Sequence, residues 1–210
     1  MNQSTRTRIA SEVVPAPEAG CRWAGIIVAL PEPLAAEITA YRRSFGDALA
    51  AQIPAHITLI TTTPIGDWAE TVQHVRQVAA SQRPFRVSVR GTGSFRPVSE
   101  VVYLQLGSGF DECVQLHELL QSGPLARDLV FDFHPHITIA HDISAAGLDE
   151  AARTLADFEA TFPVTGMGLY VHNDSGAWLL KEELKFGGTS ENQGTSRYEA
   201  APNRLGKAPA

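Results

Sequence analysis

Two copies of one tetrad hold the residue types that can transfer protons. His56-Ile57-Thr58-Leu59 and His136-Ile137-Thr138-Ile139 both read His-Ile-Thr-aliphatic. An imidazole can give or take a proton near neutral pH, because its unperturbed pKa is about 6.5. A threonine hydroxyl can donate a hydrogen bond to an oxygen that gains negative charge. The two tetrads together could therefore supply an acid, a base and two hydrogen-bond donors.

The tetrads lie in short apolar runs that are rich in β-branched residues, which is typical of strands. Successive side chains of a strand point to opposite faces. His56 and Thr58 therefore lie on the same face of their strand, and so do His136 and Thr138 on theirs. The aliphatic residues of each tetrad then point the other way, into a core. Each copy is thus expected to present an imidazole beside a hydroxyl on a rigid surface.

The repetition carries more weight than either copy. The chain has seven histidines, so one His-x-Thr match arises easily by chance, and a lone strand histidine is usually packed and hydrogen-bonded. Two copies that both have isoleucine between the histidine and the threonine, with His56 and His136 separated by 80 positions, are much harder to explain by chance. We interpret them as two related halves that each contribute one strand to a shared cleft.

The elements that must position the tetrads follow from hydrophobic periodicity and turn residues. A loop over 91–99 holds Phe95 and Arg96, and a turn over 173–176 joins the last two segments as a hairpin. Strands are expected at 23–30, 55–61, 85–90, 101–106, 134–140, 162–171 and 177–183, and helices at 33–49, 67–79, 110–121 and 145–158.

Composition bounds the class of protein and its partners. A chain of 210 residues that is 44% hydrophobic can bury one core, or two small lobes. The net charge of −6 argues against a broad basic surface for long duplex nucleic acid, although a few local donors can still hold a small anion. The chain has two cysteines, Cys21 and Cys113, and with so few we expect both thiols to be reduced, as in a cytoplasm. We also expect the protein to be a monomer.

Three regions are expected along the chain. Residues 1–21 are polar and Pro-containing, with no apolar stretch that could act as a secretion signal or a membrane anchor. Residues 22–186 hold every predicted element and form the folded domain. Residues 187–210 are rich in Gly, Ser, Thr and Asn and cannot bury enough apolar surface to order, so they are expected to be a disordered tail.

The paired tetrads resemble those of the two-histidine (2H) phosphoesterase superfamily, in particular its 2′-5′ RNA ligase and cyclic phosphodiesterase-like branch. The resemblance covers roughly residues 22 to 186 and is specific in the tetrads. It implies an α+β fold of two pseudo-symmetric lobes, each an antiparallel sheet backed by helices, with the tetrads facing across a central groove. It implies no metal or other cofactor, and a nucleotide or RNA-end phosphodiester as substrate.

Hydrolysis of a phosphodiester needs a base for the attacking water and an acid for the leaving oxygen. On this hypothesis His56 and His136 are the catalytic acid/base pair, and Thr58 and Thr138 bind the phosphate. The substrates that the resemblance implies are cyclic (2′,3′-type) or 2′-5′ linked nucleotide phosphodiesters. The sequence leaves open which histidine is the base.

Other polar and aromatic residues are weaker candidates. Arg96 could reach a phosphate or a base, although a solvated loop arginine is the commoner case. Arg42 and Arg43 are expected on the wet or cleft-facing side of their helix, with a solvated face as the default. Phe95 or Tyr103 could stack on a base, although core packing is the better default. The remaining histidines are expected at helix, turn and strand-end positions, with His134 at the edge of the groove.

Two alternatives stay open. A metal-dependent hydrolase could use the cluster His134, His136 and His141, since histidine is a common zinc ligand, but this leaves the first tetrad unexplained. A non-catalytic protein that binds a nucleotide or an RNA end is the second alternative. Simple binding does not require two titrating groups, which argues against it.

Overall fold

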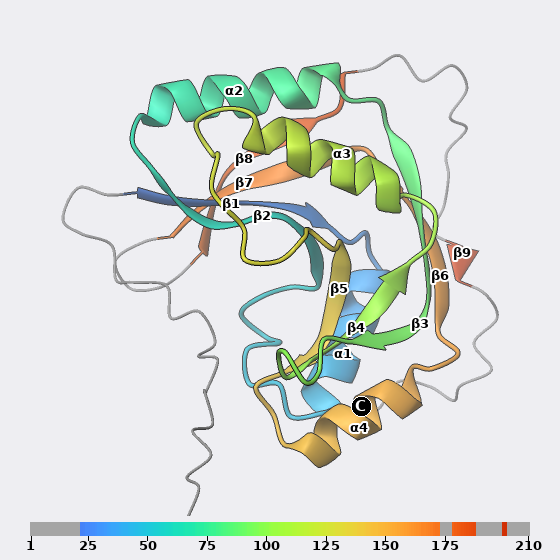
Figure 1. Ribbon diagram of the computed structural model, residues 1–210. Coiled ribbons are helices and arrows are strands. Elements are labelled where there is room, and N and C mark those ends of the chain that lie inside the picture. The colour runs from blue at the N-terminus through green and yellow to red at the C-terminus, as the bar shows by residue number, and fades with distance from the viewer. Residues whose placement is uncertain (1–21, 173–177, 188–198, 201–210) are drawn as a thin grey trace, which may run out of the picture.

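The computed structural model describes residues 22–172, 178–187 and 199–200, which form one antiparallel sheet and four helices (Figure 1). The sheet has the strand order β8-β7-β1-β2-β5-β4-β3-β6-β9. The strands are β1 (Arg22–Ala29), β2 (His56–Ile65), β3 (Phe85–Ser94), β4 (Val101–Leu106), β5 (His136–His141), β6 (Glu159–Val164), β7 (Gly166–His172), β8 (Trp178–Lys185) and β9 (Glu199–Ala200). The helices are α1 (Leu34–Ser44), α2 (Trp68–Ser81), α3 (Phe110–Gln121) and α4 (Ala145–Thr154).

The two tetrad strands lie side by side at the centre of the sheet and join its two halves. One half is β8-β7-β1-β2 and the other begins β5-β4-β3-β6. Between β2 and β5 the register contains a single matched pair, Ile57 with Ile137. The predicted architecture of two related antiparallel lobes meeting at the tetrads is therefore confirmed.

Two of the helices, α1 and α3, are exchanged between the halves. Helix α1 lies between β1 and β2 in sequence but packs on β5, and α3 lies between β4 and β5 in sequence but packs on β2. Helix α2 packs beside α3 over β7 and β8, while α4 covers β3, β4 and β5. Figure 1 shows α2 and α3 together above the sheet and α4 below it. Each tetrad strand is therefore held in part by a helix from the opposite half of the chain.

The two tetrads also share a local irregularity. In the first half Thr58 pairs with Ile27 and Ile60 pairs with Ile26, so Leu59 has no partner on β1. In the second half Thr138 pairs with Tyr103 and Ala140 with Val102, so Ile139 has no partner on β4. A β-bulge therefore follows the threonine of each tetrad. Bulges bend a strand and re-aim its side chains, and they are frequent beside active sites.

Two of the helices begin with a side-chain cap. Asp67 accepts a hydrogen bond from the backbone N–H of Glu70 at the start of α2, and Ser144 accepts one from Gly147 at the start of α4. Each bond satisfies one of the N–H groups that a helix leaves free at its N-terminus.

Some predicted boundaries are wrong. Helix α1 ends at Ser44 rather than near residue 49, because Gly46 adopts a φ of +94° that no helix continues through, and Leu49 is exposed. The strand expected over 162–171 is two strands, since β6 pairs with β3 and β7 pairs with β1. An apolar run does not reveal a change of partner strand, which is why periodicity alone missed this division.

Parts of the sequence interpretation fall outside the described residues. These parts are the leader over 1–21, the turn residues 173–176 and most of the tail over 187–210. Strands β7 and β8 on either side of that turn do pair antiparallel, as a hairpin requires. Within the tail, Glu199 and Ala200 pair with β6. None of the helices that the structure describes is long and apolar enough to cross a membrane.

Candidate functional site

The tetrads divide their side chains between core and surface as the strand pattern predicts. Ile57, Leu59, Ile137 and Ile139 are almost completely buried, whereas the histidine and threonine of each tetrad are partly exposed. The burial pattern over residues 51–60 is identical to that over 131–140. The two copies are therefore equivalent in environment as well as in sequence.

The register around the Ile57–Ile137 pair brings the four polar side chains together. In an antiparallel pair, one step forward on one strand is opposite one step back on the other. His56 is thus across from Thr138, and Thr58 is across from His136. All four lie on the face opposite to the two isoleucines. The result is a pseudo-two-fold arrangement of two imidazole–hydroxyl pairs at the centre of the sheet.

Each tetrad imidazole is held by the same backbone contact. The Nδ1–H of His56 donates to the carbonyl oxygen of Pro54 at 2.7 Å, and the Nδ1–H of His136 donates to that of His134 at 2.7 Å. A carbonyl can only accept, so Nδ1 carries the proton in the neutral ring and Nε2 carries the lone pair. Both rings are therefore set to use Nε2 for proton transfer.

The surroundings lower the pKa of both imidazoles. Burial is the main cause for His56, and the nearby positive charge of Arg42 adds to it, against the opposing hydrogen bond to Pro54. Burial is again the main cause for His136, where the neighbouring rings of His134 and His56 add like charge when protonated. Charge on one tetrad histidine thus affects the other, which agrees with their convergence on one face.

The second tetrad has an aromatic wall. The ring of His136 lies 4.9 Å from that of Phe95, edge to face, and 5.2 Å from that of Tyr103. The ring of His134 contacts the same two rings and that of Phe110. Tyr103 is buried and Phe95 is partly exposed beside the tetrad histidines, so a role of either ring in stacking on a base stays a prediction.

The first tetrad has a buried ion pair behind it. Arg42 is only 3% exposed, and its guanidinium bonds the Asp47 carboxylate at 2.8 Å and the carbonyl of Ile53 at 2.6 Å. The expectation of a solvated face is therefore wrong for Arg42, whereas Arg43 is exposed as expected. Helical periodicity predicts which face of the helix a residue occupies. It could not show that the segment 45–53 folds back over the helix and covers Arg42. Arg42 thereby fixes the chain just before Pro54 and His56.

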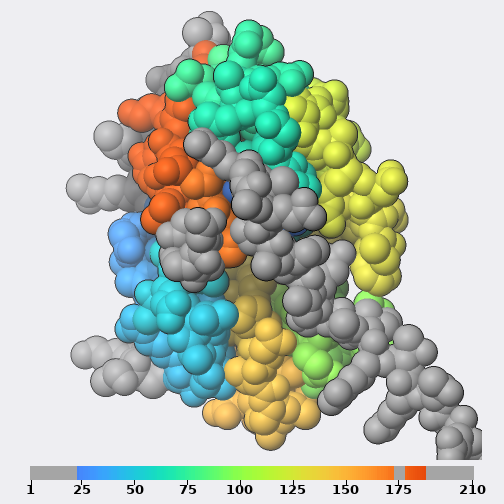
Figure 2. Space-filling view, turned by 90° about the vertical axis from the view of Figure 1, so that its left-hand side faces the viewer, coloured from blue at the N-terminus to red at the C-terminus, as the bar shows by residue number. Residues whose placement is uncertain are grey.

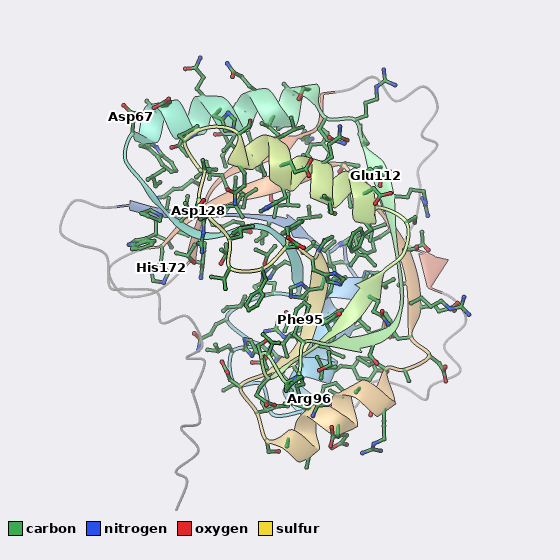
Figure 3. The ribbon with its side chains drawn as sticks, viewed as in Figure 1. Asp67, Phe95, Arg96, Glu112, Asp128 and His172 are labelled. Atoms are coloured by element: carbon green, nitrogen blue, oxygen red, sulfur yellow. The ribbon has the colours of Figure 1, made fainter. Side chains whose placement is uncertain are left out.

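Arg96 forms an ion pair with α4. Its guanidinium lies 2.8 Å from the Asp149 carboxylate, and its Nε donates to Ser94. Figure 3 shows Phe95 near β5 and Arg96 beside α4. The loop before β4 therefore directs neighbouring residues to different places, and a role of Arg96 in substrate binding stays a prediction.

The other histidines are dispersed over the fold. His74 bonds the carbonyl of Leu120, His117 bonds that of Leu59, and the ring of His172 contacts Trp178. Among the described residues, no group of three or more His, Cys, Asp or Glu side chains could hold a metal ion. The cluster of His134, His136 and His141 that the metal-dependent alternative needs is thus not formed.

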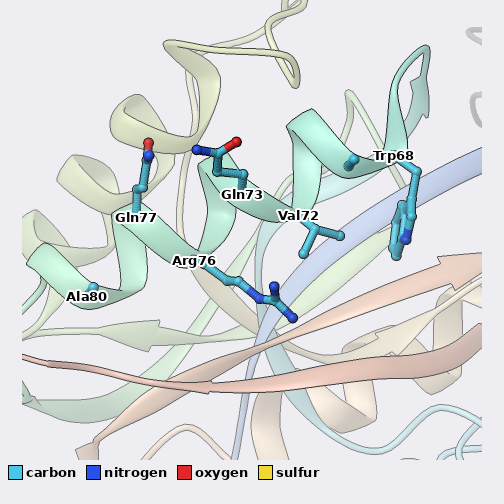
Figure 4. A pocket seen from close by; sticks show the side chains of 7 residues that line it. Trp68, Val72, Gln73, Arg76, Gln77 and Ala80 are labelled. Atoms are coloured by element: carbon cyan, nitrogen blue, oxygen red, sulfur yellow. The ribbon is translucent and has the colours of Figure 1, made fainter.

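Two surface features lie outside the tetrads. A shallow hollow follows α2, lined by Trp68, Ala69, Val72, Gln73, Arg76, Gln77 and Ala80 (Figure 4). Arg76 in this hollow pairs with Glu182 of β8. The segment before β5, yellow at the right of Figure 2, exposes Leu129, Val130 and Phe131. Neither feature holds a cluster of groups that could transfer protons, so we place the candidate site at the tetrads.

Comparisons with known proteins place the chain among phosphoesterases. Residues 30–176 match the model of the 2′-5′ RNA ligase superfamily. A phosphoesterase of Geobacillus kaustophilus is 31% identical, over 78% of this chain and 96% of its own length. One from Bacillus licheniformis is 28% identical, over 78% of this chain and 98% of its own.

Solved structures share the fold at lower identity. LigT of Escherichia coli, solved in complex with ATP, has a TM-score of 0.55 and 20% identity, with 79% of this chain and 98% of LigT covered. A Thermus thermophilus protein has a TM-score of 0.55 and 18% identity, with 80% of this chain and 100% of its own covered.

Proposed function

We propose that this chain, which belongs to the 2′-5′ RNA ligase superfamily of phosphoesterases, hydrolyses cyclic (2′,3′-type) or 2′-5′ linked nucleotide phosphodiesters. The observation that carries the proposal is the pairing of Ile57 with Ile137, which gathers two imidazoles and two hydroxyls on one face. The two halves of the chain supply equivalent groups to a space shared between them. That arrangement suits a group attacked on one side and cleaved on the other.

In the proposed reaction the two histidines divide the proton transfers. One neutral imidazole takes a proton from water at Nε2 while the water oxygen attacks phosphorus. The other, protonated imidazole gives its Nε2 proton to the leaving oxygen as the P–O bond breaks. The Nδ1–H bonds to Pro54 and His134 support this scheme, because they occupy Nδ1 of both rings and leave Nε2 as the nitrogen that can take or give a proton. Each transfer contributes on the order of 10²–10⁴ in rate.

The two threonines are proposed to bind the non-bridging oxygens of the phosphate. Charge on these oxygens grows toward the transition state, and a fixed donor stabilises it most where water is excluded. The bulge after each threonine supports the proposal, since a bulge bends the strand and changes the direction of the side chains next to it. The scheme uses no step through a metal ion.

The nature of the substrate is inferred from the relatives and from charge. LigT has been solved with ATP, with 3′-AMP and with phosphate, which favours a nucleotide-like ligand for the shared fold. The net charge of −6 favours a small substrate over a long RNA. Arg96 is already paired with Asp149 of α4, so we rank it below the tetrad residues.

The deciding experiment is a substrate panel assayed with wild type, His56→Ala and a His74→Ala control. The panel contains 2′,3′-cyclic nucleotides, 2′-5′ dinucleotides and 3′-5′ dinucleotides, each with and without chelator. Hydrolysis of the first or second class by wild type and the control, but not by His56→Ala, supports the proposal. Binding of a panel member without turnover by wild type favours the non-catalytic alternative. Loss of activity with chelator favours a metal enzyme.

A further inference from the structure

His117 is a buried titratable residue that the proposed reaction does not use. It belongs to α3 and is 7% exposed. Its Nδ1–H donates to the carbonyl of Leu59 at 2.7 Å, and its ring is stacked on Phe133 with the centroids 3.9 Å apart and the planes 4° apart. A single side chain of one helix thus contacts the bulge of the first tetrad and the segment that leads into the second.

We propose that His117 is a positioning residue that sets the placement of Thr58 relative to His136 by joining the bulge at Leu59 to Phe133. This inference rests on the proposed function, which it extends to the group that aligns the two halves of the site. His117 itself does not face the reacting atoms.

The contact with Leu59 matters because of where it lies. Leu59 follows Thr58 directly and has no partner on β1, so the regular ladder does not fix its position. An extra bulge residue needs another partner for its backbone if the bend is to have one geometry. The imidazole of His117 supplies that partner from the side of the core. The direction of the Thr58 side chain is therefore coupled to α3.

The contact with Phe133 ties the same ring to the other half of the sheet. Phe133 precedes His134, whose carbonyl accepts the Nδ1–H bond of His136. The parallel ring stack restricts how that segment can shift past α3. Between β2 and β5 there is only one matched register pair, so the ladder alone aligns the tetrads weakly. His117 is a second connection between them, on the core side.

Four variants test the inference. His117→Phe keeps a ring for Phe133 but removes the donor, and His117→Asn keeps a donor near the Nδ1 position but removes the ring. Phe133→Leu removes the stack only. His74→Phe is the matched control. His74 lies on α2 and bonds the carbonyl of Leu120 in α3 at 3.1 Å, so it contacts the helix that holds His117 but neither tetrad.

On a cyclic phosphodiester that wild type cleaves, His117→Phe should lower kcat by about 10- to 100-fold, since displacements below 1 Å can cost up to about 10²-fold. KM should change little, because the affected donor acts mainly in the transition state. His117→Asn should recover to within about fivefold of wild type, and His74→Phe should keep wild-type kcat despite a lower Tm. Phe133→Leu should lower kcat without changing the pH limbs.

Wild-type kcat in folded His117→Phe, or an equal loss in His74→Phe, would overturn the inference. If His117→Phe does not fold, Phe133→Leu takes its place, and wild-type kcat in folded Phe133→Leu overturns the inference. If wild type cleaves no member of the panel, the proposed function fails, and the positioning claim is read by NMR. The Thr58 methyl and amide signals should then shift in the His117 variants but not in His74→Phe, and unshifted signals reject it.

Discussion

Ile57 lies directly across from Ile137, and this is the matched pair through which β2 and β5 meet. The two residues are the second positions of the repeated tetrads, so the pseudo-two-fold relation between the two halves centres on this pair. Both side chains are fully buried. Their neighbours on the other face are the two imidazoles and two hydroxyls of the candidate site.

Removing either tetrad imidazole should abolish most activity. His56→Ala and His136→Ala should each lower kcat by about 10²- to 10⁴-fold, since each deletes one proton transfer. The double variant should lose little more than the worse single variant, because residues that act as one unit are not additive. Steady-state kinetics on a 2′,3′-cyclic nucleotide measure this, with circular dichroism to verify folding. Full activity in either single variant ends the proposal.

Removing either tetrad hydroxyl should weaken the transition state. Thr58→Val and Thr138→Val preserve side-chain shape and strand propensity, so the fold should remain. Each should lower kcat by roughly 10²- to 10³-fold, the usual cost of losing one oxyanion donor. Thr161→Val in β6 is a control with the same change of chemistry at a strand position outside the tetrads. A loss in the control as large as in the tetrads would show that hydroxyl removal acts through folding.

The lowered pKa values of His56 and His136 predict an acid-shifted pH optimum. Catalysis needs one neutral and one protonated imidazole, so kcat/KM should be bell-shaped with its maximum below about pH 6.5, the unperturbed value. The unfolded chain binds protons to these rings before the folded chain does. The free energy of unfolding should therefore fall as the pH drops below about 6.5. An optimum above about pH 7.5 would contradict the direction of both shifts.

Replacing His134 should reveal the role of its neighbour. His134→Phe removes a like charge that lowers the pKa of His136, but it keeps the aromatic packing and the backbone carbonyl that bonds Nδ1 of His136. One limb of the pH profile should then move to higher pH. Movement of the acidic limb identifies His136 as the base, and movement of the basic limb identifies it as the acid. A profile with both limbs unmoved rejects the coupling.

The buried pair of Arg42 and Asp47 should matter for stability. Asp47→Ala leaves the guanidinium buried without its carboxylate, and breaking such a pair costs about 3–5 kcal/mol of unfolding free energy. Glu182→Ala, which breaks the exposed pair with Arg76, is the control and should change stability little. Urea denaturation measures both variants. Equal midpoints for the two would show that the buried pair is not what fixes the segment before His56.

Local signals in the sequence were enough to predict most of the elements, though not all of their boundaries, and to single out the residues that could do chemistry. Period-two alternation put His56 and Thr58 on one face with Ile57 and Leu59 in the core, because this pattern depends only on strand geometry. Helix α3 begins and ends where periodicity placed it, and Asp67 caps α2 as its residue type predicts. Repetition of the tetrad indicated two halves, and the resemblance it carries implied their arrangement.

Tertiary structure decided what no local pattern contains. Which strands become neighbours, and hence that Ile57 meets Ile137, depends on contacts between residues far apart in sequence. The same holds for the burial of Arg42, the aromatic wall beside His136 and the exchange of α1 and α3 between the halves. His117 illustrates the difference, because its helical position was readable from spacing while its bond to Leu59 exists only once β2 lies against α3. The sequence determines the types of the residues and their spacing along the chain, whereas the distances between their side chains in space depend on how the elements pack.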